Sequence, residues 1–212
     1  MRLLPCGDRA LLAEFDALDH ALAAHSRWTA SAALGIVELV PAARTVLVRL
    51  DPAVIGLGAA EQWLVAHAPA VTPGGSQARG GGQPIRLSVV YDGDDLAVVA
   101  EAWGCSPSAV VDRHVATEWV CAFIGFTPGF PYLVPAPGTD ALPPVPRRAT
   151  SRARVPSGSV ALAAEYCGVY PRESPGGWQL IGRTSAVLWD ADRASPALVT
   201  PGARVRFTPV HA

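Results

Sequence analysis

The stretch TPGGSQARGGGQ, at residues 72–83, decides how this chain of 212 residues is organised. Five of its twelve residues are glycine, and apolar residues do not recur in it at a helical or strand period. Such a composition predicts a flexible linker or an exposed loop rather than a structural element. We therefore expect two domains, at residues 1–71 and 84–212, on either side of a linker at residues 72–83.

The segment before the linker predicts a small α/β domain. Its apolar residues follow strand and helix periods in the order strand, helix, strand, strand, helix, at residues 10–15, 17–33, 36–40, 45–50 and 59–67. This order makes up most of a split βαβ, ferredoxin-like unit, which one further strand would close.

Two helices are expected near the start of the second segment. Asp94 or Asp95 can cap a helix that runs to Trp103, because a short carboxylate accepts hydrogen bonds from the free amides of the first turn. Ser106-Pro107 reads as a second cap with proline at the first helical position, which opens a helix over residues 108–115.

The rest of the second segment predicts short strands. Residues 85–91 alternate like a strand, and short apolar runs then alternate with proline and glycine clusters, at residues 119–124, 159–163, 186–190 and 203–208. This spacing favours a closed or sandwich-like β architecture over a helical one. The expected fold class is therefore α+β, with a mostly-β second domain.

Composition excludes several classes of protein. Half of the chain is apolar, which allows a packed core, and the net charge is −1. All 17 basic residues are arginine, so the chain has no P-loop lysine, no Schiff-base lysine and no lysine to carry biotin or lipoate. The near-zero charge also argues against a general nucleic-acid binder.

Cysteine and histidine spacing predicts neither a disulfide framework nor a metal site. The four cysteines form no C-x-x-C pair, so we expect free and mostly buried thiols. The five histidines form no H-x-x-x-H pair. The start of the chain has no secretory apolar region, and no apolar run reaches the ~18 residues of a membrane span. We expect a soluble cytoplasmic protein without a membrane partner.

The first candidate site is the stretch GFTPGFPYL at residues 125–133, where prolines and glycines alternate with aromatic residues. Proline fixes φ and glycine allows close approach of the backbone, so this pattern predicts a stiff loop that presents aromatic faces. Such a loop suits a ligand pocket or a partner interface. The alternative is a buried aromatic turn that only fills the barrel.

The second candidate is PRRATSRAR at residues 146–154, which has four arginines in eight residues and no acid between them. Guanidinium groups this close repel one another unless a negative group lies among them, and their geometry suits a carboxylate or a phosphate. The alternative is a solvated loop whose arginines pair with acids elsewhere in the chain.

Two further features carry candidate residues. In YPRESPGGW, at residues 170–178, the amides of Gly176 and Gly177 could form an anion-binding nest or belong to a plain hairpin turn. His114 follows Arg113 near a predicted helix C-terminus, where the helix dipole favours the imidazolium cation. Both a structural and a catalytic role for His114 remain open.

Taken together, these stretches resemble one known family. GFTPGFPYL, PRRATSRARVPSGSV and YPRESPGGWQLIGRT occur in this order in the family of 5-oxoprolinase B-type subunits, also called allophanate hydrolase subunit 1 and sporulation kinase inhibitor KipI. The opening GDRALL at residues 7–12 is also similar to that family. The resemblance implies an N-terminal ferredoxin-like domain and a cyclophilin-like β-barrel.

The resemblance also implies a heteromeric enzyme. It implies pairing with a homologous C-type subunit and action with an A-type subunit in the ATP-dependent opening of 5-oxoproline to glutamate. ATP and Mg²⁺ would bind at a site shared by the complex, with no metal held by this chain, which would be inactive alone. Relatives are fused in urea carboxylase as its carboxyltransferase part.

The resemblance also implies which residues form the site. The resemblance implies catalytic roles for His114, Arg147, Arg152 and Arg154. It implies substrate or partner binding by residues in and around the three motifs: Gly125, Phe126, Pro128, Gly129, Phe130, Tyr132, Ser159, Tyr166, Tyr170, Gly176, Gly177 and Trp178.

The chain departs from the family pattern at one place near these residues. The family pattern looks like A-G-x-Q-T-G-I-Y-P, whereas residues 163–171 read AAEYCGVYP. A glycine, an amide and a hydroxyl are thus replaced by Ala164, Tyr166 and Cys167, and Ser151-Arg152 stands where the family has a second Pro-Arg. If the missing polar pair touches substrate, the departure predicts a different amide substrate or no activity.

Three alternatives to the 5-oxoprolinase interpretation remain at this stage. One is a regulatory protein that docks on a sporulation-type histidine kinase through the aromatic loop. Another is a component of an allophanate hydrolase or urea amidolyase-type complex. The third, a prolyl isomerase, rests on the implied barrel alone, which is a weak argument for function.

Overall fold

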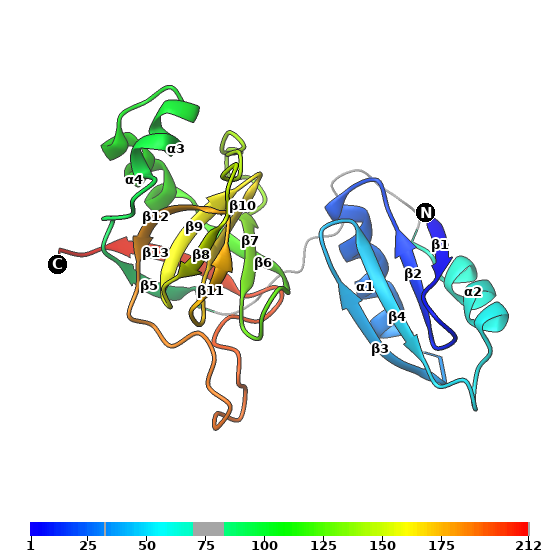
Figure 1. Ribbon diagram of the computed structural model, residues 1–212. Coiled ribbons are helices and arrows are strands. Elements are labelled where there is room, and N and C mark those ends of the chain that lie inside the picture. The colour runs from blue at the N-terminus through cyan, green and yellow to red at the C-terminus, as the bar shows by residue number, and fades with distance from the viewer. Residues whose placement is uncertain (32, 70–82, 212) are drawn as a thin grey trace. The chain divides into compact units, whose positions relative to one another are not determined.

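The computed structural model describes residues 1–31, 33–69 and 83–211. The chain divides into two compact units, Met1–Ala78 and Arg79–Ala212, which are described separately below. Of the stretch predicted as a linker, residues 72–82 lie outside the described residues. Figure 1 shows the first unit in blue and cyan and the second in green through red.

The first unit is a four-stranded antiparallel sheet with two helices. The strand order is β1-β2-β4-β3. The strands and helices span Arg2–Pro5 (β1), Ala10–Glu14 (β2), Leu18–Ala30 (α1), Ile36–Pro41 (β3), Thr45–Leu50 (β4) and Leu57–Ala66 (α2). Sequence patterns predicted every one of these elements except β1, which pairs with β2 at the edge of the sheet.

Alternation along β2 and β4 explains the core of this unit. Leu11 and Ala13 of β2 and Val46 and Val48 of β4 are buried, because alternate residues of a strand point to one face of the sheet. Helix α1 covers them with residues spaced at helical intervals, among them the fully buried Trp28.

The second unit is a mostly-β, barrel-like sheet with few helices. Seven strands lie in the order β12-β9-β10-β7-β6-β13-β5. They span Ile85–Val89 (β5), Trp119–Ile124 (β6), Pro131–Pro135 (β7), Ser159–Ala163 (β9), Tyr166–Val169 (β10), Gln179–Arg183 (β12) and Arg204–Pro209 (β13). A separate two-stranded ribbon consists of β8 (Arg152–Val155) and β11 (Ser174–Gly176).

The two edges of the seven-stranded sheet approach each other and nearly close it. The amide of Val90, just after β5, donates to the carbonyl of Arg183 in β12 at 2.9 Å, and the amide of Arg183 donates back at 2.9 Å. Gly182 makes this approach possible, because a Cβ there would lie 2.5 Å from the carbonyl oxygen of Val90. Closure leaves few unpaired strand edges.

Helices α3 (Leu96–Ala102) and α4 (Pro107–Ala116) lie together at one end of the barrel-like sheet (Figure 1). The cap of α4 forms as predicted, since the Ser106 hydroxyl accepts a hydrogen bond from the Ala109 amide at 3.2 Å. The prediction for α3 was wrong in its chemistry. Asp95 stands at the N-cap, but its carboxylate makes no cap hydrogen bond and instead binds arginines.

Two other expectations are corrected by the structure. The run at residues 186–190 forms no strand, and Trp189 makes only an isolated bridge to Ala197. All four cysteines are free as expected, but only Cys121 and Cys167 are buried. Within the described part of the chain, no helix is long and apolar enough to cross a membrane.

Candidate functional site

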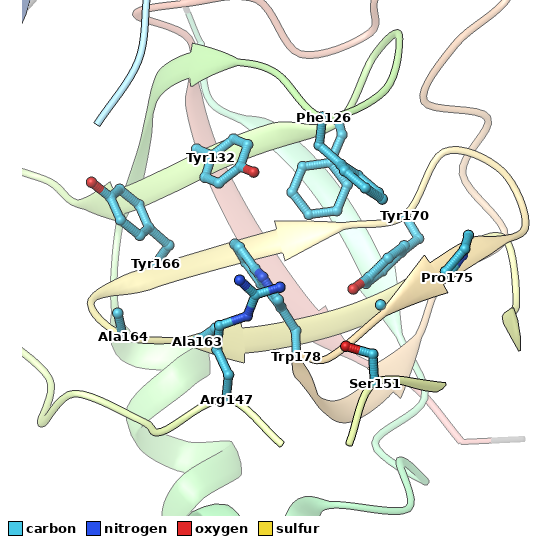
Figure 2. A pocket seen from close by; sticks show the side chains of 12 residues that line it. Phe126, Tyr132, Arg147, Ser151, Ala163, Ala164, Tyr166, Tyr170, Pro175 and Trp178 are labelled. Carbon is cyan, nitrogen blue, oxygen red and sulfur yellow. The ribbon is translucent and has the colours of Figure 1, made fainter. Parts of the chain in front are cut away.

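A pocket of about 520 Å³ opens in the barrel unit where the three sequence motifs meet (Figure 2). The segment before β8, the β9–β10 turn and the β11–β12 junction border it together with the aromatic loop. Its twelve lining residues are Phe126, Phe130, Tyr132, Arg147, Ser151, Ala163, Ala164, Tyr166, Tyr170, Pro175, Gly176 and Trp178.

Six aromatic side chains form most of the pocket wall. The Phe130 ring meets Tyr170 and Trp178 edge to face, with centroid distances of 5.1 and 5.3 Å. Tyr132 meets Tyr166 and Trp178 in the same way at 5.6 and 5.5 Å. Edge-to-face pairs of this kind are favourable, so each ring holds its neighbours and the wall is rigid.

A glycine in β10 makes room for this wall. A Cβ on Gly168 would lie 2.7 Å from Cζ of Phe130 and 2.9 Å from Cζ3 of Trp178. Contacts this short are repulsive, so only glycine lets both rings lie against the strand. Gly176 has the same role on the other side, where a Cβ would collide with the Tyr170 hydroxyl.

The aromatic loop is the stiff turn that its prolines and glycines predicted. The Thr127 amide donates to the Gly125 carbonyl at 2.7 Å, which forms a three-residue turn around Phe126 at φ 64°. A positive φ is strained for a phenylalanine, and such strain is held where the surrounding structure fixes it. The Phe126 side chain is 61% exposed at the pocket rim.

Of the four arginines in residues 147–154, only Arg147 lines the pocket. Arg148 and Arg152 bind the buried carboxylate of Asp95, and Arg154 pairs with Glu173 on the surface. Arg147 forms no ion pair with any acid in the described residues, and Figure 2 shows its guanidinium directed into the space between the aromatic side chains. Three arginines of the predicted cluster are therefore paired with acids, and Arg147 is left as a free cation at the pocket.

Three tyrosine hydroxyls add hydrogen-bond donors to the pocket. Burial raises the pKa of Tyr132 and of Tyr170, and the nearby Arg147 charge only partly opposes this in each case. Burial likewise raises the pKa of Tyr166. All three side chains are therefore neutral at physiological pH and can donate hydrogen bonds.

His114 lies in the barrel core and not among the pocket residues. Its Nδ1 lies 2.8 Å from the Tyr91 hydroxyl and its Nε2 lies 3.3 Å from Sγ of Cys167. Burial lowers its pKa to about 3, so the imidazole is neutral, although the helix dipole alone predicted a cation. Desolvation outweighs the dipole at this fully buried position.

The structure thus brings together eight of the sixteen residues that the sequence suggested: Phe126, Phe130, Tyr132, Arg147, Tyr166, Tyr170, Gly176 and Trp178. The other eight do not line the pocket: His114, Arg152, Arg154, Gly125, Pro128, Gly129, Ser159 and Gly177. Among them, Ser159 is buried and donates its hydroxyl hydrogen to the Pro156 carbonyl at 2.8 Å.

Four lining residues were not among the predicted site residues, namely Ser151, Ala163, Ala164 and Pro175, although Ser151 and Ala164 were noted as departures from the family pattern. Ser151 lies inside the arginine-rich stretch and Pro175 inside YPRESPGGW, so both were close to a recognised signal. Ala164 has φ 49°, a left-handed conformation, in the turn between β9 and β10. The family resemblance implies glycine at this position, which is the residue that this backbone conformation favours.

The pocket suits a small anion better than a metal ion. It combines one free guanidinium with neutral hydroxyls and has no carboxylate in its lining. Within residues 1–31, 33–69 and 83–211, no group of three or more His, Cys, Asp or Glu side chains is placed to hold a metal. An arginine beside aromatic faces fits a flat molecule that carries a carboxylate.

Comparison with known proteins gives the family of the chain. The model of the family described as carboxyltransferase domain, subdomain C and D, matches residues 1–199. The B-type subunit of 5-oxoprolinase from Escherichia coli O157:H7 is 50% identical over 128 residues, and that from Bacillus subtilis strain 168 is 39% identical over 126. These matches cover 59% and 58% of this chain.

The chain spans 57% of the length of the E. coli relative and 51% of that of the B. subtilis relative. A structure of the Kluyveromyces lactis urea amidolyase aligns with 98% of this chain and 15% of that much longer chain, with a TM-score of 0.77 and 21% identity. At that identity the similarity concerns the fold.

Proposed function

Because this chain belongs to the carboxyltransferase-domain family, subdomains C and D, we propose that it is the B-type subunit of an ATP-dependent 5-oxoprolinase. In this proposal the complex adds water across the lactam C–N bond of 5-oxo-L-proline and releases L-glutamate, while ATP is hydrolysed. The 50% identity to the B-type subunit of E. coli carries the proposal. The reaction takes place in the cytoplasm and the chain is inactive alone.

The pocket supports this proposal through its match to the substrate. The guanidinium of Arg147 binds the carboxylate of 5-oxoproline, and the faces of Phe130 and Trp178 pack against its five-membered ring. The neutral hydroxyls of Tyr132 and Tyr170 donate to the lactam oxygen. Donors directed at this oxygen stabilise the negative charge that develops on it as the amide is activated.

Partner proteins supply the rest of the chemistry in this proposal. The pocket lining includes no histidine, carboxylate or lysine that could act as a general base, and its residues do not fit a magnesium ion. We assign the binding of ATP and Mg²⁺ to the site shared with the C-type subunit, in a complex that also contains the A-type subunit. This chain contributes substrate binding and donors to the lactam oxygen.

The proposal extends to the folds of the two units. In the first unit, β1 takes the edge position that the closing strand occupies in a ferredoxin-like unit, although it comes from the start of the chain. The nearly closed sheet of the second unit supports a cyclophilin-like barrel.

Reconstitution tests the proposal. The chain is mixed with purified A-type and C-type subunits, and L-glutamate and ADP are measured with 5-oxo-L-proline as substrate. We expect glutamate formation that requires ATP and is lost when this chain is omitted. No glutamate from an assembled complex with bound nucleotide would refute the proposed substrate.

Allophanate serves as the competing substrate in the same assay. The departures from the family pattern at Ala164 and Tyr166 lie in the pocket lining, where they can alter which amide substrate the pocket prefers. Turnover of allophanate but not of 5-oxoproline would reassign the chain to an allophanate-hydrolysing complex.

A further inference from the structure

Asp95 is a buried carboxylate that lies outside the pocket lining but holds the segment that carries Arg147. Its side chain is among the few charged groups in the core, with the residue 2% exposed. Arg148 Nη1 donates to Oδ1 at 2.7 Å, and Arg152 donates through Nη2 to Oδ1 at 2.9 Å. Arg152 Nη1 also lies 2.8 Å from Oδ2.

The same carboxylate is fixed to the barrel wall. The Leu180 amide in β12 donates to Oδ2 at 2.7 Å, and the Asp95 amide donates to the Leu180 carbonyl at 3.0 Å. Burial alone would raise the pKa of Asp95, but the hydrogen bonds from Arg152 and Leu180 and the nearby arginine charges lower it overall. The carboxylate is therefore ionised and rigidly placed.

Arg147 lies between two residues whose backbones are held. On one side, Nε2 of the buried Gln179 donates to the Pro146 carbonyl at 2.9 Å. On the other side, the Arg148 amide donates to the Gly177 carbonyl at 2.8 Å while the Arg148 side chain reaches Asp95. These contacts leave the Arg147 backbone little freedom, although its own side chain is free to bind a ligand.

We propose that Asp95 is a positioning residue, which fixes the segment at residues 146–152 so that Arg147 presents its guanidinium to the carboxylate of the substrate. Gln179 holds the same segment from its other end. Removing the Asp95 charge leaves Arg148 without an acid partner and Arg152 with only the exposed carboxylate of Asp94, at 3.7 Å, so the repulsion between the two arginines releases the segment. The inference rests on the proposed function of the pocket, but neither Asp95 nor Gln179 lines it.

Asp95→Asn tests the inference in the reconstituted complex, with Asp92→Asn as the matched control. Asp92 also pairs with an arginine, Arg183 at 2.9 Å, but on the exposed outside of the barrel. We expect Asp95→Asn to raise the KM for 5-oxoproline by about tenfold, with kcat changed by less than about threefold, because one binding contact is misplaced. Asp92→Asn should leave both constants unchanged.

Two readouts separate positioning from a general loss of structure. Binding of 2-pyrrolidinone, which has the lactam ring but no carboxylate, should be equal in wild type and Asp95→Asn, because Arg147 does not contact it. Should Asp95→Asn fold poorly, Gln179→Leu breaks only the contact to Pro146 and should give the same ligand pattern. Equal loss of affinity for both ligands would overturn the positioning role.

Hydrogen exchange of the chain tests, without any ligand, whether Asp95 holds the segment at residues 146–152. Asp95→Asn should speed amide exchange in residues 146–152 by about tenfold while β9 and β10 keep their protection. Unchanged exchange in that segment would refute the inference even if the complex turns over 5-oxoproline. If exchange is faster but the complex does not use 5-oxoproline, the proposed function is rejected. The inference that Asp95 holds the segment then still stands.

Discussion

The four arginines at residues 147–154 have different surroundings, although they lie within eight positions of one another. The sequence allowed either an anion site or a solvated, paired loop, and the structure places one of the four arginines at a pocket and the other three in ion pairs. Arg148, Arg152 and Arg154 pair with acids, whereas Arg147 faces the pocket. The division could not be predicted from the stretch itself, because the deciding acid, Asp95, lies about fifty residues earlier and was interpreted as a helix cap.

Ala164 gives a prediction about backbone strain. Its φ of 49° favours glycine, so Ala164→Gly should raise the free energy of unfolding by about 1 kcal/mol. Urea unfolding measures the change. Ala163→Gly is the matched control, since Ala163 is a buried β9 residue without a positive φ and should lose about 1 kcal/mol. A loss of stability in both variants would contradict the strain at Ala164.

His114 gives a prediction about pH. Its pKa is about 3 in the folded chain against about 6.5 when unfolded, so the unfolded state binds the extra proton between these values. Stability is therefore full above pH 6.5 and falls as the pH drops. From pH 7 to pH 5 the group should cost about 2 kcal/mol of unfolding free energy.

Urea unfolding of wild type and His114→Gln at both pH values isolates this contribution, since the other titrating groups are common to both proteins. The variant should lose about 2 kcal/mol less than wild type on acidification. An equal loss in the two proteins would show that His114 is not a buried neutral group.

At the scale of elements, the periodic segments were predicted and the irregular ones were not. The apolar runs that became β6 and β9 and the cap of α4 are local signals, and each formed where expected. Strand β1 was missed because it is only four residues long, half-buried and ends in Pro5, so its formation depends on pairing with β2. Run 186–190 was apolar enough for a strand but found no partner beyond one bridge.

Strand β10 gives a prediction about packing of the aromatic wall. Gly168→Ala should lower the free energy of unfolding by about 1–3 kcal/mol, because its Cβ would press on Phe130 and Trp178 and neither buried ring can move away. Thermal or urea unfolding measures the effect.

Gly125→Ala is the matched control for this variant. It lies near the same wall, but its Cβ would have no neighbour closer than 3.5 Å, at Tyr132. It should change stability by less than about 0.5 kcal/mol. Equal effects of the two substitutions would contradict the close packing at Gly168.

At the scale of the whole molecule, the pocket unites segments that are far apart in the sequence. Phe126, Arg147, Tyr170 and Trp178 come from separate motifs and meet only because the barrel-like sheet brings them together. Each of these residues lies in one of the three sequence motifs, but no single motif predicts that they line one pocket. The family resemblance also suggested a catalytic role for His114, which is buried in the barrel core. A resemblance identifies matching positions but does not show what surrounds them.

The central claim is that Arg147 binds the carboxylate of the substrate in a 5-oxoprolinase complex. The most direct measurement is kcat/KM for 5-oxo-L-proline in complexes reconstituted with Arg147→Ala, with Arg154→Ala as the control from the same stretch. Arg154 is 81% exposed and pairs with Glu173. Loss of a charge-assisted contact predicts a fall of about 100-fold for Arg147→Ala and no more than about twofold for Arg154→Ala. Equal turnover by wild type and Arg147→Ala would contradict the account.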